Sequence, residues 1–100
     1  MPVVLNKRTD KIPADAVYVG RPSKWGNPVT VKGLGRLYPQ DTREELHKRA
    51  VDWYRVYIGT PFGRSKELME HINELRGKDL VCWCAPLPCH ADILLELANR

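Results

Sequence analysis

Three cysteines and a histidine lie close together near the C-terminal end of the chain. Cys82, Cys84, Cys89 and His90 stand where an apolar segment gives way to a helical pattern, and the sequence has no other cysteine. A junction of this kind can hold a metal, activate a thiol at a helix N-terminus, or offer backbone N–H groups to an anion. Each alternative predicts a different function.

The metal alternative has the four soft ligands of a tetrahedral zinc site, but their spacing opposes it. Cys82 and Cys84 would share one face of a strand, with Trp83 on the other, and Cys89 and His90 are adjacent. Structural zinc sites usually separate the members of a ligand pair by about two to four residues. We therefore predict neither metal nor cofactor and keep zinc as an alternative.

The thiol alternative concerns Cys89, which follows Pro88 at the expected start of the last helix. A helix dipole and a nearby imidazolium both favour a thiolate. Adjacent side chains on a helix do not face each other, so Cys89 and His90 do not form a nucleophile and base through adjacency. We expect the Cys89 side chain to pack or cap this turn.

The anion alternative uses the turn over residues 85–92. A loop between a central strand and a helix offers unpaired N–H groups to a phosphate, although the glycine-rich dinucleotide fingerprint is absent. His90 could contact a phosphate or ribose, and Asp92 could orient it or simply complement the helix dipole. If the protein is an enzyme, we predict His90 and Asp92 as acid and base, with Cys84 and Cys89 contacting the ligand.

A second candidate segment is the loop over residues 21–28, which is rich in turn formers. Its ligand-binding candidates are Arg21, Ser23, Lys24, Trp25 and Asn27. The two basic side chains suit phosphate, the indole suits stacking on a base, and the amide suits a hydrogen bond to a base. The loop meets the 85–92 turn if the strands preceding them are parallel. The alternative is a rigid surface turn whose tryptophan covers the core.

The remaining sequence indicates the elements that position these segments. Strands are expected over residues 3–5, 16–20 and 79–84, with a further short edge strand over 29–31 and a loop over 32–40. Helices are expected from a capping box of Asp41 and Glu44 to Gly59, from Ser65 to Gly77 with Leu68, Met69, Ile72 and Leu75 buried, and from Cys89 to Asn99. This order predicts a single α/β domain over residues 1–100, of small Rossmann-like three-layer type, with a short, mainly parallel sheet and about three helices.

Composition narrows the class of protein. Sixteen Lys and Arg against twelve Asp and Glu give a net charge of +4, which is compatible with phosphate-bearing partners. We expect a cytoplasmic location without membrane association, because neither a signal peptide nor a long apolar segment is evident. The charge pattern does not indicate an oligomeric state.

The two candidate segments also carry a family resemblance. Residues 17–28, Val-Tyr-Val-Gly-Arg-Pro-Ser-Lys-Trp-Gly-Asn-Pro, and 82–92, Cys-Trp-Cys-Ala-Pro-Leu-Pro-Cys-His-Ala-Asp, resemble the domain of unknown function 4326 family. That family consists of small proteins, many of them from bacteriophages, so a host-cytoplasmic location would follow for a phage-encoded member. The resemblance spans essentially the whole chain and implies no particular reaction. The C-terminal quarter is also similar to another uncharacterised Rossmann-like family.

We thus predict that the protein binds a nucleotide or related phosphorylated small molecule between the 85–92 turn and the 21–28 loop. Whether it also processes this ligand stays open. An enzyme of this kind would be a nucleotide-directed hydrolase or transferase. The alternatives are a non-catalytic phage protein that sequesters a nucleotide signal, and a nucleic-acid-binding or protein-interaction module that contains zinc or lacks it.

Overall fold

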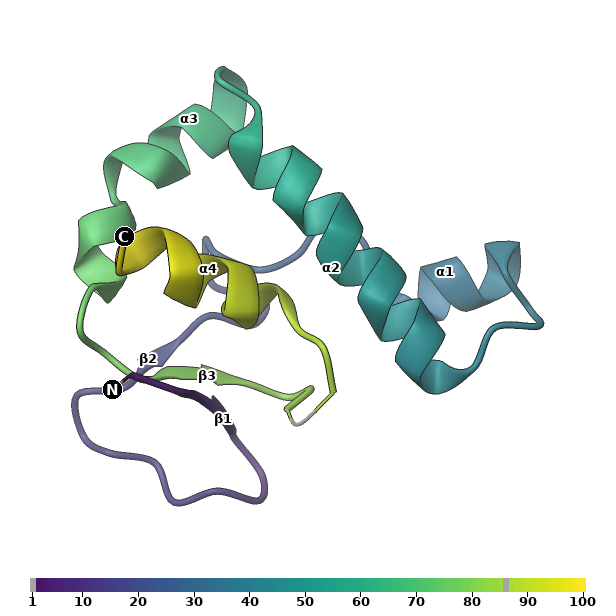
Figure 1. Ribbon diagram of the computed structural model, residues 1–100, viewed down its shortest axis with the longest axis horizontal. Helices are drawn as coiled ribbons and strands as arrows, with labels where there is room; N and C mark the ends of the chain where they lie inside the picture. The colour runs from purple at the N-terminus through teal and green to yellow at the C-terminus, as the bar shows by residue number, and fades with distance from the viewer. Residues whose placement is uncertain (1, 86) are drawn as a thin grey trace.

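A short parallel sheet organises the protein. The computed structural model describes residues 2–85 and 87–100. Within them β1 (Val4–Asn6), β2 (Val17–Tyr18) and β3 (Leu80–Cys82) form a three-stranded sheet in the order β1-β3-β2, with both pairs parallel (Figure 1). The carboxyl ends of the strands therefore share one edge. This confirms the predicted parallel sheet, and the central strand is fully buried, as its apolar sequence indicates.

Helices lie on one side of the sheet (Figure 1). They are α1 (Val31–Leu37), α2 (Arg43–Gly59), α3 (Gly63–Glu70), a 3-10 helix η1 (Ile72–Leu75) and α4 (His90–Ala98). The last helix packs directly on β3 and β1, and α2 packs against α1, α3 and α4. Figure 1 shows α4 above the sheet, with α2 running obliquely beyond it and α1 beside the first turns of α2. The fold is a small α/β domain.

Helix α1 contradicts two expectations, because residues 29–31 do not form an edge strand and residues 32–40 are not entirely loop. Thr30 begins the helix, since its hydroxyl accepts a hydrogen bond from Gly33 N at 2.8 Å. The two glycines of α1 are poor helix formers, so local propensity does not predict a helix in this segment. Packing against α2 and the Thr30 cap outweigh that cost.

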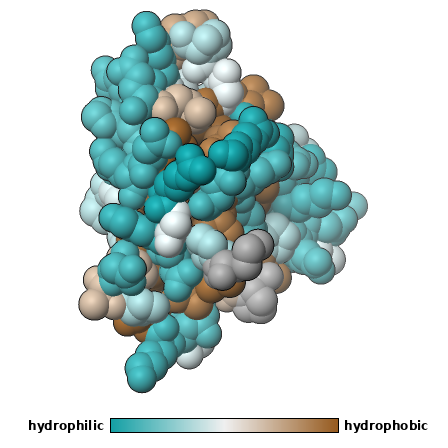
Figure 2. All heavy atoms as spheres, turned by 60° about the vertical axis from the view of Figure 1, so that its left-hand side comes forward, coloured by the Kyte–Doolittle hydropathy of each residue, from teal (hydrophilic) through white to brown (hydrophobic). Residues whose placement is uncertain are grey.

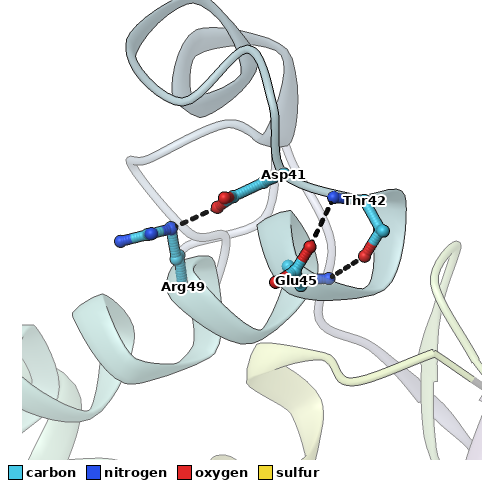
Figure 3. A network of polar contacts seen from close by, with 4 residues as sticks. All are labelled: Asp41, Thr42, Glu45 and Arg49. Carbon is cyan, nitrogen blue, oxygen red and sulfur yellow. Dashed lines mark hydrogen bonds and ion pairs between the residues drawn. The ribbon is translucent and has the colours of Figure 1, made fainter.

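The start of α2 is one residue later than predicted, because the capping box is formed by Thr42 and Glu45 rather than Asp41 and Glu44 (Figure 3). Thr42 N donates to the Glu45 carboxylate at 2.7 Å, and Glu45 N donates to the Thr42 hydroxyl at 3.1 Å. Asp41 instead pairs with the Arg49 side chain. The predicted end at Gly59 is confirmed.

The predicted helix from Ser65 to Gly77 is wrong as one continuous element. The chain leaves the α-helical conformation at His71, and η1 follows as a separate turn. Met69 was expected in the core but is 37% exposed, whereas Leu68 and Leu75 are buried as predicted. Gly77 ends the segment with φ at +75°, a conformation that favours glycine.

The hydrophobic core lies between the sheet, α4 and the inner face of α2. Its largest fully buried side chains are Tyr54, Ile58, Leu68, Leu75, Leu80, Leu94, Val19 and Cys82. On the face drawn in Figure 2, hydrophobic atoms appear as separate areas among hydrophilic side chains. Across the described residues, none of the helices combines the length and the apolar character that a membrane span requires.

Candidate functional site

A cavity of about 320 Å³ opens at the carboxyl edge of the sheet, between the loop after β2, the turn before α4 and the inner face of α2. Of the predicted site residues, those that line it are Arg21, Asn27, Cys84, Cys89 and His90. Because β2 and β3 are parallel, the two candidate segments meet there as expected. Open parallel sheets commonly bind ligands outside the carboxyl ends of their strands.

Other predicted residues lie outside the cavity lining. Trp25 is 2% exposed and belongs to the core. The alternative prediction, a surface turn whose tryptophan covers the core, therefore holds for Trp25. Lys24 forms an ion pair with Glu74 at 2.9 Å. Ser23 takes part in the turn, where its N–H donates to Gly20 O at 2.9 Å.

Asn27 fastens the loop to α2. Its side-chain N–H donates to Ala50 O at 3.0 Å, and its carbonyl oxygen accepts from Val29 N at 3.0 Å. The side chain is 8% exposed, so these hydrogen bonds satisfy an amide that would be costly to bury alone. Asn27 therefore shapes the cavity wall through its backbone contacts.

His90 is held by hydrogen bonds on both sides of its ring. Nε2 lies 2.7 Å from Val19 O and must donate to it, while Nδ1 lies 3.5 Å from the Cys89 sulfur. The expectation that these adjacent side chains do not face each other is wrong, because Cys89 is the extended N-cap residue and lies outside the helix. The ring also meets Tyr54 edge-on, with centroids 5.0 Å apart. Burial lowers the pKa of His90, an effect that the Val19 carbonyl partly opposes. The neutral imidazole thus ties the start of α4 to the end of β2.

Asp92 acts locally at the start of α4. Its carboxylate accepts a hydrogen bond from Cys89 N at 3.1 Å, and Asp92 N donates to Cys89 O at 3.0 Å. The side chain is exposed and stands in the first turn of the helix. This geometry is the helix-end role that the sequence offered as an alternative to catalysis.

The side chains of Cys82, Cys84 and Cys89 all line the cavity. Hydrogen bonds from Cys84 and Cys89, together with the backbone at Cys84 and Ala85, lower the pKa of Cys82, while the Cys82 sulfur raises that of Cys89. Among the residues that the structure describes, no group of three or more His, Cys, Asp or Glu side chains is placed to hold a metal ion.

His47 is a cavity residue that the sequence analysis missed. It is 7% exposed and lies on α2, facing the cavity that Pro88 also lines. Burial, assisted by the charge of Arg43, lowers the pKa of His47. The helical spacing of the sequence could have identified it, because His47 lies three, seven and eleven residues before Ala50, Tyr54 and Ile58, the other buried residues of α2.

The rim of the cavity also carries aromatic residues outside the predicted set. Tyr18 and Trp83 both line it, and Trp83 Nε1 donates to the Tyr18 hydroxyl at 2.9 Å. Trp83 is 48% exposed. The strand expected over residues 79–84 ends at Cys82, and Trp83 lines the same cavity as Cys82 and Cys84, so the predicted placement of Trp83 on the opposite strand face does not apply.

A second, larger groove of about 690 Å³ lies between α2, α3 and α4. Its apolar lining includes Ile58, Met69 and Leu97, and Arg55 and Arg100 at its rim both pair with Glu96. None of the predicted site residues lines it. The smaller cavity is therefore the better candidate, since sequence motif and sheet topology both lead to it.

Comparison with known proteins identifies the family. The model of a domain of unknown function (DUF4326) matches residues 4–100. The chain belongs to the DUF4326 family. An "Uncharacterized 12.4 kDa protein in nrdA-td intergenic region" of Enterobacteria phage T4 is 50% identical over 30 residues, which are 30% of this chain and 28% of that protein. No solved structure matches the chain.

Proposed function

We propose that this DUF4326 protein binds a nucleotide or related phosphorylated small molecule in the cavity at the carboxyl edge of its sheet. The observation that carries this proposal is that Arg21 and Asn27 of the loop and Cys89 and His90 of the turn line one cavity; residue 86 of the predicted 85–92 turn lies outside the described residues. Its volume of about 320 Å³ lies at the lower end of the range usual for small-molecule sites. We also propose that the α/β domain is of the small Rossmann-like three-layer type predicted from the sequence.

The charge distribution supports a phosphate at the mouth of the cavity. Arg21 is exposed on the rim, and within residues 2–85 and 87–100 it takes part in no ion pair. The lining also includes His47 and His90, whose pKa values are lowered by burial, so these imidazoles add no positive charge at neutral pH. An anionic group is therefore best stabilised beside Arg21.

Hydrogen bonding favours binding without turnover. Nε2 of His90 is committed to Val19 O, and the Asp92 carboxylate is committed to Cys89 N. A general acid or base must reach the proton it transfers; the Nε2 atom of His90 is already engaged, and Asp92 does not line the cavity. The sequestering alternative therefore fits these contacts better than a hydrolase or transferase.

Calorimetric titration with thymidine monophosphate, inorganic phosphate and pyrophosphate tests the proposal. We expect saturable binding of the nucleotide, weakened at least tenfold by Arg21→Ala and little changed by Arg36→Ala, an exposed arginine of α1 outside the cavity. Chromatography of the titrated sample should recover the nucleotide intact. Equal affinities for all three proteins would refute the site, and product formation would refute a purely binding role.

A further inference from the structure

A cluster of aromatic and basic side chains, which we call the Trp83 surface, lies beside the cavity. It consists of Lys7, Arg8, Tyr18 and Trp83, contributed by the carboxyl ends of all three strands. Lys7 Nζ is 4.6 Å from the centroid of the Tyr18 ring and 5.3 Å from that of Trp83, and the Arg8 guanidinium is 5.6 Å from Trp83. Cations at these distances interact with the faces of the rings.

The backbone holds this surface in place. Asn6 donates to Trp83 O at 3.2 Å and to Ala85 O at 2.8 Å, while its side-chain oxygen accepts from Arg8 N at 2.8 Å. Lys7 N donates to Cys82 O at 2.8 Å. The segment that carries the cations and the segment that carries the indole are thus fixed to each other before any ligand arrives.

Packing of the core does not explain why the Trp83 indole is exposed. Trp83 leaves nearly half of its surface in solvent, whereas Trp25 supplies indole to the core. Its Nε1–H is engaged by Tyr18, whose hydroxyl in turn donates to Arg21 O at 2.7 Å, so the ring is oriented although it is exposed. An oriented, exposed aromatic ring beside flexible cations is the arrangement that stacks a base and neutralises the adjoining phosphates.

We propose that the Trp83 surface binds single-stranded nucleic acid, with one base stacked on the indole and backbone phosphates beside the flanking cations. Stacking displaces the Lys7 and Arg8 side chains from the ring face, and both then reach phosphate oxygens. Both basic residues of this surface, Lys7 and Arg8, follow β1, and Arg21 of the cavity rim follows β2 at the same edge of the sheet. The loop between β1 and β2 has two acidic side chains, Asp10 and Asp15, and the Asp10 carboxylate accepts a hydrogen bond from Asn6 N at 2.8 Å.

This inference goes beyond the proposed function, because it assigns a polymer to the rim rather than a small molecule to the cavity. The two sites adjoin each other and share Tyr18 and Trp83. A strand bound on the rim is expected to place one nucleotide at the cavity mouth. Binding of a mononucleotide alone is nevertheless a separate observation, and the two can succeed or fail independently.

Fluorescence anisotropy with a labelled oligothymidylate of about ten nucleotides tests the inference. We expect Trp83→Ala to weaken binding by about fivefold to a hundredfold, the usual effect of losing one stacked base. Trp83→Phe should retain most of the affinity, because phenylalanine still stacks. The matched control is Trp53→Ala, since Trp53 is 42% exposed on α2 and stacks on Tyr57 away from this surface. Circular dichroism verifies that each variant is folded.

Salt dependence supplies a second readout. Replacing both Lys7 and Arg8 by alanine should lower the slope of log affinity against log salt by about 1.4, since each phosphate contact on a single strand contributes about 0.7. Equal affinities for the Trp83→Ala and Trp53→Ala variants would overturn the inference, as would binding of thymidine monophosphate without any binding of the strand. Strand binding without mononucleotide binding would instead support the inference and overturn the proposed function.

Discussion

Replacing His90 with leucine tests how the cavity is held together. The variant removes the donor to Val19 O, a buried carbonyl with its acceptor contact at 2.7 Å, and leaves that oxygen unsatisfied. Such a loss costs about 1–3 kcal/mol, and the lost edge contact with Tyr54 adds about 0.5–1.5 kcal/mol. We therefore expect the free energy of unfolding to fall by about 2–4 kcal/mol, with the melting temperature lowered by about 10 °C or more.

Chemical denaturation in urea, followed by circular dichroism, measures this change. His71→Leu is the matched control, because His71 lies on the surface and pairs with Glu74 at 3.0 Å, a kind of contact worth little in water. It should change stability by less than about 0.5 kcal/mol. If the His90 variant stays within that margin of the wild type, the linking role assigned to His90 is wrong.

The same variant has a pH signature. Burial lowers the pKa values of His90 and His47, so the unfolded chain takes up protons near pH 6.5 that the folded chain resists. The contribution of the two neutral histidines to the free energy of unfolding is present above about pH 6.5. Below that pH the free energy of unfolding declines by up to about 1.4 kcal/mol per pH unit for each histidine. His90→Leu should remove one of the two contributions between about pH 7.5 and about pH 5.5. An unchanged pH dependence would contradict this account.

Three further predictions concern the surroundings of the cavity. Cys84→Ala should raise the pKa of Cys82, because the Cys84 thiol is the largest cause of its lowering; ultraviolet titration of the thiolate measures the shift, and an unchanged titration would contradict the shared hydrogen bonds. Gly26→Ala should weaken nucleotide binding more than folding, since a Cβ there would lie 2.7 Å from Arg21 Cγ; calorimetry and thermal unfolding compare the two, and normal affinity would refute it. Asp92→Ala should destabilise the fold by about 0.5–2 kcal/mol in urea through loss of the α4 cap, and a larger loss of ligand affinity than of stability would restore Asp92 as a site residue.

The sequence predicted the placement of the site better than the roles of its residues. The apolar run before Cys82 identified the buried central strand, and its parallel pairing with β2 brought the two loops together. The pattern could not say which indole would be buried. Trp25 and Trp83 both follow strands, and the three-dimensional path of the loop, which hydrogen-bonds to Tyr54 through Trp25 O, directs the first inward.

Errors in the helices have local causes. Asp41 and Thr42 are both good N-cap residues, and each has a glutamate three positions later. The sequence therefore fits a capping box at either position equally well. The Asp41 pairing with Arg49 leaves Thr42 as the cap. Helix α1 contains two glycines and starts on a β-branched valine, so its stability comes from contact with α2, which no local pattern reveals.

Chemical-shift mapping by NMR during titration with thymidine monophosphate tests the central proposal most directly. We expect saturable shifts at the backbone amides of Gly20, Arg21, Cys84 and His90, which surround the cavity at the carboxyl edge of the sheet. Shifts confined to the groove beside Met69, or no shifts at millimolar nucleotide, would contradict the proposal that this cavity is a nucleotide site.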